Sequence, residues 1–462
     1  MTWYPYRAGA NPAHSARIGV ISDQVGSWDI ECAGQRQTVS IADAADEKGV
    51  AWAEFVGLPA GDHTATITGL GRSESVAVRI SAGPHKTVFG SCFSTYSWWD
   101  ISAGAMESEQ PHQICHLGDA PYVDNLRQVT LASPATNERR EIVMRQENRK
   151  FKTHPSRLRL LSNAAIFGCV SDHDATPGND APGRDDIGAF PGEDAANWWH
   201  YNGGYAKIIT ATGSAGEAEW RDLIDRGFAA FDLYNPFFAN PDAGTVYPAG
   251  TIPVMTPYYR WTVGRVEYFQ LEMVRYSDYM TQVAGVTNRS LMGLLEKQWL
   301  LDRVSKSTAD FRVIFAPQQV LKESAIAAIG RNDYGRACYG DERNDVVAGL
   351  RVKPGTVIVS GDVHSPSVMR HESGGNVLWQ VTPCPTGTDG TVLGAENSPD
   401  TQLRWRERHQ VGSVVPRRYY GVVEDSGSGP LYIAIKSHTG GVCWAGYLTP
   451  DSNEIQYRLP KI

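Results

Sequence analysis

The chain has 462 residues and a formal net charge of −8, with 42% hydrophobic and 20% charged residues. This composition is typical of a folded globular protein and excludes a disordered chain. The acidic balance gives no electrostatic case for a nucleic-acid-binding surface, and no apolar stretch approaches the ~20 residues of a membrane-spanning helix. The N-terminus lacks the basic and apolar regions of a signal peptide, so we expect a cytoplasmic protein, or a periplasmic or secreted one if a signal was removed.

The first part of the chain has the pattern of an all-β domain. Four segments alternate apolar and polar side chains with a period of two, which predicts strands at residues 16–21, 37–41, 50–55 and 75–80. Turn residues at 58–63 separate two of them. We therefore expect an N-terminal β-sandwich domain over residues 1–84, followed by a second domain over residues 85–462.

From residue 85 onward, short apolar strands alternate with helical and loop segments. Strands are expected at residues 87–89, 113–117, 164–170, 266–271, 311–315, 356–360 and 377–382. Helices are expected at residues 141–151, 217–228 and 291–304. In the last helix, Leu291, Leu294, Leu295 and Trp299 fall on one face, and Ser290 is the expected N-cap. The pattern is that of an α/β fold.

Four of the expected strands end in motifs that are rich in reactive side chains. The motifs are GSC at 90–92, GDAPY at 118–122, SDHD at 171–174 and GDVH at 361–364. In open α/β sheets, sites are built at the carboxyl ends of the strands. A thiol, a phenol, carboxylates and imidazoles at one such edge indicate a metal site that acts on phosphate esters.

The cysteines differ in their sequence contexts. There are seven, an odd and widely scattered number that does not indicate a disulfide framework. Cys115 and Cys169 lie inside apolar runs and are expected in the core. Cys92 ends its strand and is followed by a polar, aromatic turn. No local signature supports a cysteine hydrolase that pairs Cys92 with a histidine.

In this order, the four motifs resemble the alkaline phosphatase D (PhoD-like) branch of the calcineurin-like metallophosphoesterase superfamily. That branch carries a GSC motif, a GDxxY motif, a DDHE-type turn and a GDVH ending. Two further segments, QWL at 298–300 and YGDER at 339–343, are similar to segments of the branch. The resemblance covers residues 86–440 and implies a four-layer α/β sandwich (α+β type), with two mixed β-sheets flanked by helices. The branch also includes proteins with an N-terminal β domain.

The resemblance implies a first metal site that binds Fe3+. Cys92, Asp119, Tyr122 and His364 match the iron ligands of the branch. A thiolate, a phenolate and a carboxylate are anionic and strongly donating, and such a set suits ferric iron better than Mg2+ or Ca2+.

A second ion is implied beside the first. Asp119 would bridge to it, and Asp172 and Asp362 would complete an oxygen-rich shell. Carboxylate ligands favour a hard cation, so Ca2+ is expected, with Mg2+ or Mn2+ as the alternatives.

The implied reaction is hydrolysis of a small-molecule phosphoric ester, of the alkaline phosphatase or phosphodiesterase type (EC 3.1). Asp119 and His173 match its catalytic positions. Water or hydroxide would attack phosphorus in line, and His173 would donate a proton to the leaving alkoxide. Phosphotriesterase-type activity is an alternative, and a catalytically weak metal-binding or interaction protein is another.

The chain departs from the branch at two places. Ser171 stands where the DDHE-type turn has a carboxylate, and Asp174 stands where it has Glu. The Asp-Thr-Arg segment of the branch is altered, so that its Arg is either displaced by one position, to Arg275, or lost. Arg275 and Arg343 are candidate substrate-binding residues for a phosphoryl oxygen, the alternative for each being a surface or structural ion pair. The oligomeric state stays open.

Overall fold

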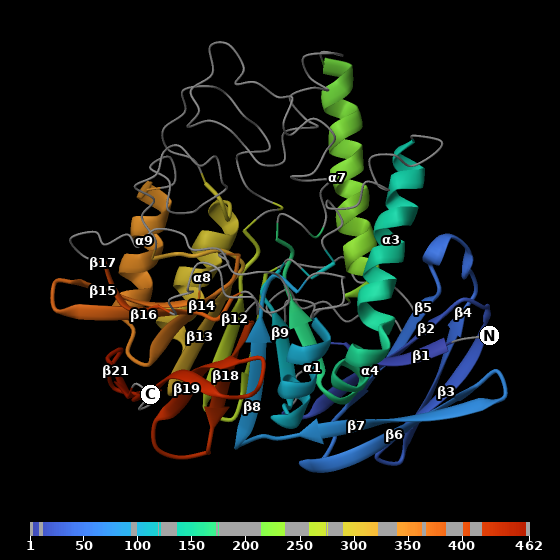
Figure 1. Ribbon diagram of the computed structural model, residues 1–462, viewed down its shortest axis with the longest axis horizontal. Coiled ribbons are helices and arrows are strands. Elements are labelled where there is room, and N and C mark those ends of the chain that lie inside the picture. Colours follow the sequence, from blue (N-terminus) through green and yellow to red (C-terminus); the bar gives the residue numbers. More distant parts are fainter. Residues whose placement is uncertain are drawn as a thin grey trace.

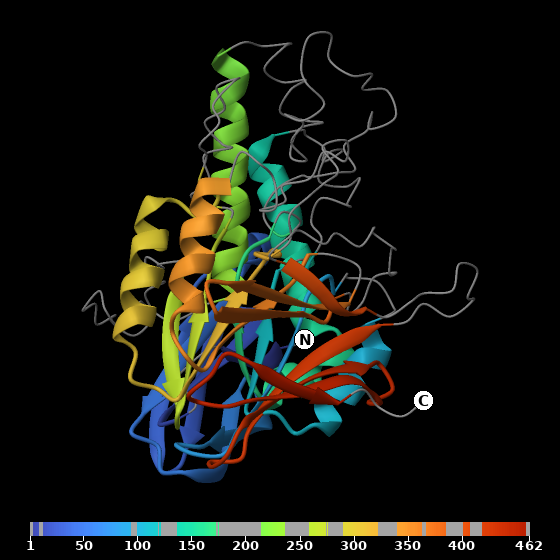
Figure 2. The same cartoon turned by 90° about the vertical axis from the view of Figure 1, so that its left-hand side faces the viewer.

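The computed structural model describes residues 3–8, 13–93, 99–118, 120–121, 136–171, 174, 214–235, 258–273, 275, 290–321, 340–362, 366–384, 401–406 and 418–458. Two seven-stranded mixed sheets lie face to face and carry helices on their outer sides (Figures 1 and 2). The expected four-layer sandwich with a preceding all-β region is therefore confirmed.

The first sheet has the strand order β10-β9-β8-β18-β19-β20-β21. Three parallel strands form one side: β8 (His85–Gly90), β9 (Gln113–His116) and β10 (Ala165–Gly168). The other side is antiparallel and consists of β18 (Tyr419–Asp425), β19 (Leu431–Ser437), β20 (Val442–Leu448) and β21 (Ile455–Arg458). The parallel strands are those that the apolar runs predicted.

The second sheet has the order β11-β12-β13-β14-β16-β15-β17. Its parallel centre comprises β12 (Val266–Gln270), β13 (Phe311–Ala316), β14 (Thr356–Ser360) and β16 (Asn376–Thr382). Antiparallel strands flank it: β11 (Tyr259–Val263), β15 (Ser367–Ser373) and β17 (Thr401–Arg406). β14 is buried along its whole length, as its nearly pure β-branched sequence predicts.

Helices cover both outer faces. α1 (Trp99–Ser108) and α4 (Pro155–Asn163) contact the first sheet, and α8 (Leu294–Lys306) and α9 (Gly340–Arg351) lie side by side on the second (Figure 2). α3 (Asn137–Thr153) and α7 (Ser214–Tyr234) pack against each other beside the sheets (Figure 1). Among the described residues, no helix is long and apolar enough to cross a membrane.

The parallel strands of the first sheet are buried on both faces. Val88, Ile114 and Ile166 join the core under α1 and α4, whereas their neighbours Phe89, Cys115 and Phe167 join the core between the sheets. The Phe89 ring lies 5.8 Å from that of Phe315 on the opposite sheet. Burial on both faces explains why these strands are apolar throughout rather than alternating.

The N-terminal region is a β-sandwich with its own core around Trp28. One sheet pairs β1 (Trp3–Ala8), β2 (Ser15–Ser22) and β5 (Val50–Val56). The other pairs β4 (Gln35–Ile41), β3 (Gly26–Cys32), β6 (Gly61–Gly69) and β7 (Arg72–Ile80), and a short 3-10 helix at Ala45–Glu47 precedes β5. The sandwich contacts the helices through Glu47, which pairs with Arg149 at 2.6 Å and accepts at its backbone oxygen from the Tyr234 hydroxyl at 2.7 Å. The domain division at residue 84 stays a prediction.

The expectation for the helix at 291–304 was wrong in two respects. The helix begins at Leu294, so its N-cap is Gly293, and Ser290 instead donates its hydroxyl to Glu342 of α9. Leu294 and Leu295 are 61% and 74% exposed, whereas Leu300 and Val304 are buried. The face that packs against the protein is therefore set by contact with α9 and β12, and not by the densest run of leucines.

Candidate metal centre

Three motif-bearing strands of the first sheet end level with one another. Gly90 at the end of β8 pairs with His116 of β9, and His116 pairs in turn with Gly168 of β10. The chain leaves each strand at the same edge of the sheet. The residues that follow these three ends are therefore brought together, as expected for a site at the carboxyl ends of parallel strands.

The end of β14, from the second sheet, joins this edge. The Asp362 backbone N–H donates to Ser91 Oγ at 3.1 Å, and Cys92 Sγ lies 3.5 Å from the Asp362 carbonyl oxygen. The Cys92 backbone N–H donates to the carbonyl of Gly118 at 3.4 Å. The GSC, GDAPY and GDVH motifs thus meet through hydrogen bonds between described residues.

Two glycines make this close approach possible. A Cβ atom on Gly361 would lie 2.6 Å from Ser91 Oγ and 2.7 Å from the Leu117 carbonyl oxygen. Gly118 has φ of +81°, and a Cβ atom there would lie 2.2 Å from the Cβ of Ser171. Both positions exclude a side chain, so the Gly in each motif has a packing reason.

Cys92 and Asp362, which are two of the expected metal ligands, have an unusual backbone conformation. Their φ values are +57° and +66°, in the left-handed region that side-chain-bearing residues seldom adopt. Such strain is maintained only where the surroundings impose it, and it concentrates at functional sites. The two residues touch each other, so the strain is localised at the junction of the two sheets.

The Cys92 sulfur is buried beside a second sulfur. Cys92 and Cys384 are both 0% exposed, and together they form a separate small cluster. Their Sγ atoms are 3.0 Å apart, and Ser91 Oγ lies 3.4 Å from Cys92 Sγ. Cys384 follows β16 and was not identified from the sequence as a site residue. The expected core cysteines, Cys115 and Cys169, are buried as predicted.

Asp174, the residue that replaces Glu of the DDHE-type turn, holds the GDAPY loop. One carboxylate oxygen accepts from the Ala120 backbone N–H at 2.6 Å, and the other accepts from the Ser171 N–H at 2.8 Å. The side chain is fully buried. Asp174 therefore ties the end of β10 to the loop after β9, a role that its sequence position alone did not indicate.

We expect Asp174→Asn to lower the free energy of unfolding by about 1–3 kcal/mol, because its amide group would face one backbone N–H donor with another donor. Chemical denaturation measures this change. Asp451→Asn, in an exposed turn, removes a carboxylate without such contacts and serves as the control. Equal destabilisation by both substitutions would contradict the assigned role of Asp174.

Lys152, near the C-terminus of α3, is a second residue that the sequence did not single out. Its side chain is buried, and burial lowers its pKa to about 7, while the charge of Asp174 opposes that shift. A lysine with its pKa near neutrality beside a candidate site is a functional candidate. Only the tertiary packing reveals it, because the sequence around it reads as an ordinary charged helix.

The stability of the protein should rise with pH between about 7 and 10.5 on account of Lys152. In that window the unfolded chain holds a proton that the folded chain has released, since the pKa falls from 10.5 to about 7 on folding. Lys152 therefore adds up to about 1.4 kcal/mol per pH unit to the slope of the free energy of unfolding against pH. Denaturant unfolding of the wild type and of Lys152→Met at pH 7 and pH 9 measures the difference. Lys150→Met, on the same helix and 61% exposed, should keep the wild-type slope.

Five expected site residues, namely Asp119, Tyr122, Asp172, His173 and His364, lie outside the described residues. Within the described residues no three His, Cys, Asp or Glu side chains are grouped closely enough to hold a metal ion. The described residues that flank these five nevertheless converge on Cys92 and Asp362. A buried thiol at a strained junction, framed by the motifs that carry the remaining donors, fits a metal centre.

The two candidate substrate-binding arginines lie in different surroundings. Arg275 forms a bidentate ion pair with Asp232 of α7, at 2.9 and 3.0 Å, and lies over the Phe228 ring. Arg343 is buried on α9 and lines a pocket away from β8. Their substrate-binding roles stay predictions. The adjacent Glu342 accepts hydrogen bonds from the backbone N–H groups of Leu291 and Met292, so it anchors the start of α8.

The model of the PhoD-like phosphatase family matches residues 195–411 of the chain. The resemblance to the PhoD-like branch is confirmed. A solved structure of PhoD is similar over 99% of this chain and 92% of that one, at 13% identity and a TM-score of 0.66. A purple acid phosphatase, PPD1 from yellow lupin (Lupinus luteus) seeds, is similar over 95% of this chain and 72% of that one, at 10% identity and a TM-score of 0.54.

At these identities, the two structures establish the calcineurin-like fold of this chain and no more. No curated protein matches the chain in sequence. The family match and the shared fold support a metallophosphoesterase.

Proposed function

We propose that this PhoD-like chain is a metal-dependent hydrolase of small phosphoric esters, of the phosphatase or phosphodiesterase type. The observation that carries the proposal is the junction of the two sheets. There Cys92 and Asp362, both in strained conformations, contact each other across 270 residues of sequence. The match to the PhoD-like phosphatase family supports the same reaction class.

The proposed ligands divide into two sets. Cys92, Asp119, Tyr122 and His364 would hold Fe3+, and Asp119 would share the second ion, Ca2+ or alternatively Mg2+ or Mn2+, with Asp172 and Asp362. When bound, the two cations would lower the pKa of a water molecule and neutralise charge that develops on the phosphoryl oxygens.

The remaining roles belong to side chains of the chain. His173 would protonate the leaving alkoxide. Arg343 or Arg275 would orient the phosphoryl group, and Arg275 could do so only if its ion pair with Asp232 opened. Asp174 and Lys152 would maintain the loop and the electrostatic environment beside these groups.

Metal analysis and a visible spectrum of the purified protein, followed by mono-, di- and triester substrates on the same sample, test this function. We expect bound iron, a sulfur- or phenolate-to-iron absorption band, and hydrolysis of at least one ester class. Preference for the triester would favour the phosphotriesterase alternative. Bound metal without hydrolysis of any ester would contradict the enzyme and favour the metal-binding protein. The cytoplasmic location stays a prediction.

A further inference from the structure

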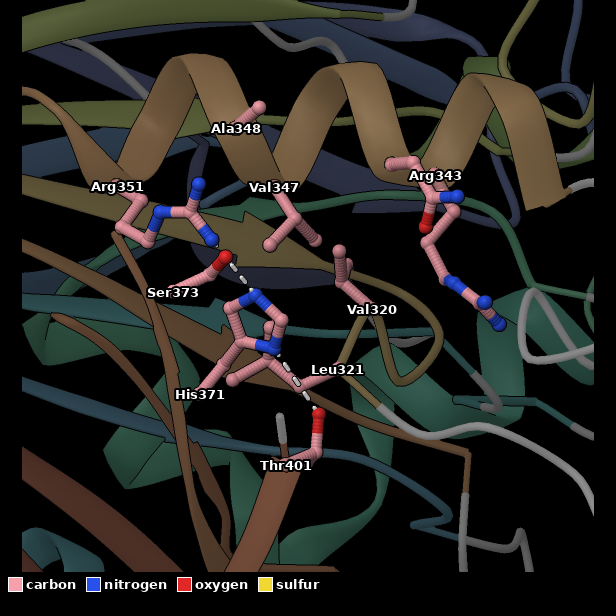
Figure 3. Close-up of a pocket in the computed structure, with 10 residues that line it drawn as sticks. Val320, Leu321, Arg343, Val347, Ala348, Arg351, His371, Ser373 and Thr401 are labelled. Atoms are coloured by element: carbon pink, nitrogen blue, oxygen red, sulfur yellow. Dashed lines mark hydrogen bonds between the residues drawn. The ribbon is translucent and has the colours of Figure 1, made fainter. Parts of the chain in front are cut away.

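We propose that the pocket between α9, β15 and β17 binds a phosphate-type oxyanion (Figure 3). This α9 pocket has a volume of about 340 Å³, and Arg343, Arg351, His371, Ser373 and Thr401 contribute to its wall. The proposal concerns a site separate from the candidate metal centre and does not depend on the proposed function.

The end of the α9 pocket that holds Arg351 and His371 lies toward the start of β14, whereas the metal centre lies beyond the end of that strand. His371 pairs with Leu378 of β16, and the next residue of β16, Trp379, pairs with Val357 near the start of β14. Asp362 follows the other end of the same strand. Five residues of a strand span about 16 Å, so an anion at His371 would not contact the metal centre.

The wall of the α9 pocket is positively charged. Arg343, Val347 and Arg351 lie at four-residue intervals on one face of α9, which Figure 3 shows above the cavity. Among the described residues that line the pocket, none is an aspartate or a glutamate. The Arg351 guanidinium therefore borders a water-accessible space to which no described lining residue contributes a carboxylate, and this arrangement favours an anion.

The Arg351 guanidinium has N–H groups that are available to bind a ligand. Within the part of the chain that the structure describes, no carboxylate pairs with Arg351, and its buried Nε has no hydrogen-bond partner. Its Nη1 lies 2.9 Å from His371 Nε2, and His371 Nδ1 lies 3.1 Å from Thr401 Oγ1. Because an arginine only donates, His371 Nε2 accepts, so the imidazole proton lies on Nδ1 and is directed to Thr401. These two hydrogen bonds, from Arg351 to His371 and from His371 to Thr401, hold the guanidinium in place.

The donors suit a tetrahedral anion. Arg351 supplies a planar fork of N–H groups, and the hydroxyls of Ser373 and Thr401 approach from β15 and β17. Phosphate has oxygens in several directions and a charge near −2, whereas a carboxylate uses one plane and one charge. The volume also leaves room for the organic part of a small phosphate ester.

Arg370 provides a matched control one residue from His371. Successive residues of a strand point to opposite faces, and the Arg370 guanidinium is paired with Glu454 at 2.9 Å and with Glu372. Its charge is therefore already neutralised by carboxylates, away from the α9 pocket.

Calorimetric titration of the metal-loaded chain with inorganic phosphate tests the proposal. The wild type and Arg370→Gln should bind one phosphate more than Arg351→Gln, or bind it at least tenfold more tightly. A phosphate held at the metal centre adds equally to all three, so it does not affect the comparison. The same number and affinity of phosphates in the wild type and in Arg351→Gln would overturn the proposal.

Two further measurements complete the experiment. Ser373→Ala, on the half-buried end of β15, should weaken phosphate binding without loss of folding, and thermal melting checks each variant. Methylphosphonate, which resembles a phosphate ester but resists hydrolysis, is titrated in parallel. Tighter binding of methylphosphonate would identify an esterified ligand, and tighter binding of phosphate a free one. Failure of both ions to bind the α9 pocket at millimolar concentration would overturn the proposal.

We also infer that Cys384 is a positioning residue for Cys92, an inference that rests on the proposed iron site. The two buried sulfurs are 3.0 Å apart, and Cys384 Sγ is placed as the donor. A metal-bound thiolate cannot donate, so the Cys384 S–H would donate to it. Hydrogen bonds to a ligand atom orient it and adjust its electron donation to the metal.

The visible spectrum of the iron-loaded protein tests the role of Cys384. Cys384→Ala should retain iron but shift the sulfur-to-iron absorption band, and Cys384→Ser, which keeps a donor, should restore the band toward its wild-type position. An unshifted band in Cys384→Ala would overturn this inference. Absence of bound iron in the wild type would contradict the proposed iron site instead.

Discussion

Cys92→Ala should release iron from the protein and reduce the rate of ester hydrolysis by at least about 10²–10³-fold. Removal of one group that stabilises a transition state reduces kcat by about this factor. Cys92 is buried at the junction of β8 and β14, where its sulfur lies 3.0 Å from the Cys384 sulfur and 3.5 Å from the Asp362 carbonyl oxygen. An alanine there would leave the ferric ion without its softest and most strongly donating ligand. Iron content by elemental analysis and turnover on the best ester substrate measure the two effects.

The control for this prediction is Cys443→Ala on β20, which removes a half-buried thiol from a strand at the far side of the first sheet. That variant should keep wild-type iron and turnover. If Cys92→Ala also retained both, Cys92 would not be an iron ligand, and the first metal site would have to be assigned to other residues.

His173→Ala should leave the metals bound while reducing turnover by about 10²–10⁴-fold, the usual contribution of a general acid. In the sequence, His173 lies between Ser171 and Asp174, which follow β10. The Asp174 carboxylate accepts hydrogen bonds from the Ser171 N–H and from the Ala120 N–H of the GDAPY loop. His173 is not among the proposed metal ligands, so the contents of iron and of the second ion should match those of the wild type. Turnover of the wild type should fall at high pH as the general acid loses its proton, and this fall should be absent in His173→Ala.

His63→Ala, on β6 of the N-terminal sandwich, serves as the matched control and should leave both metals and turnover unchanged. Wild-type turnover in His173→Ala would exclude the acid role. Loss of metal together with turnover would instead identify His173 as a ligand, and the division between ligands and acid would need revision.

Much of the fold could be predicted because its signals are local. The bounds of β14 agree with the sequence expectation residue for residue, since a run of β-branched residues followed by Gly has few other conformations. The core strands β8, β9 and β10 agree to within a few residues for the same reason. Strands β3 and β6 were missed because charged and small residues interrupt their apolar pattern, and β1 was missed because it contains Pro5. All three are recognised only by their pairing.

The start of α8 shows how local patterns fail. Three leucines and a tryptophan suggested a buried face, yet Leu294 and Leu295 point to solvent and Glu296 is buried. The Glu296 carboxylate accepts from the Glu272 backbone N–H at 2.7 Å, and burial raises its pKa well above the usual range. A buried carboxyl that anchors a strand end to a helix has no periodic signature in sequence, because its partner lies 24 residues away.

The amino-acid sequence by itself indicated a metallophosphoesterase, because four ordered motifs supply thiol, phenol, carboxylate and imidazole groups after apolar strands. Only the tertiary structure decided which groups meet: Cys92 with Asp362 and Cys384, Asp174 with Ala120, and Arg351 with His371. Those contacts depend on how two sheets and their helices pack, and packing is a property of the whole chain rather than of any one segment.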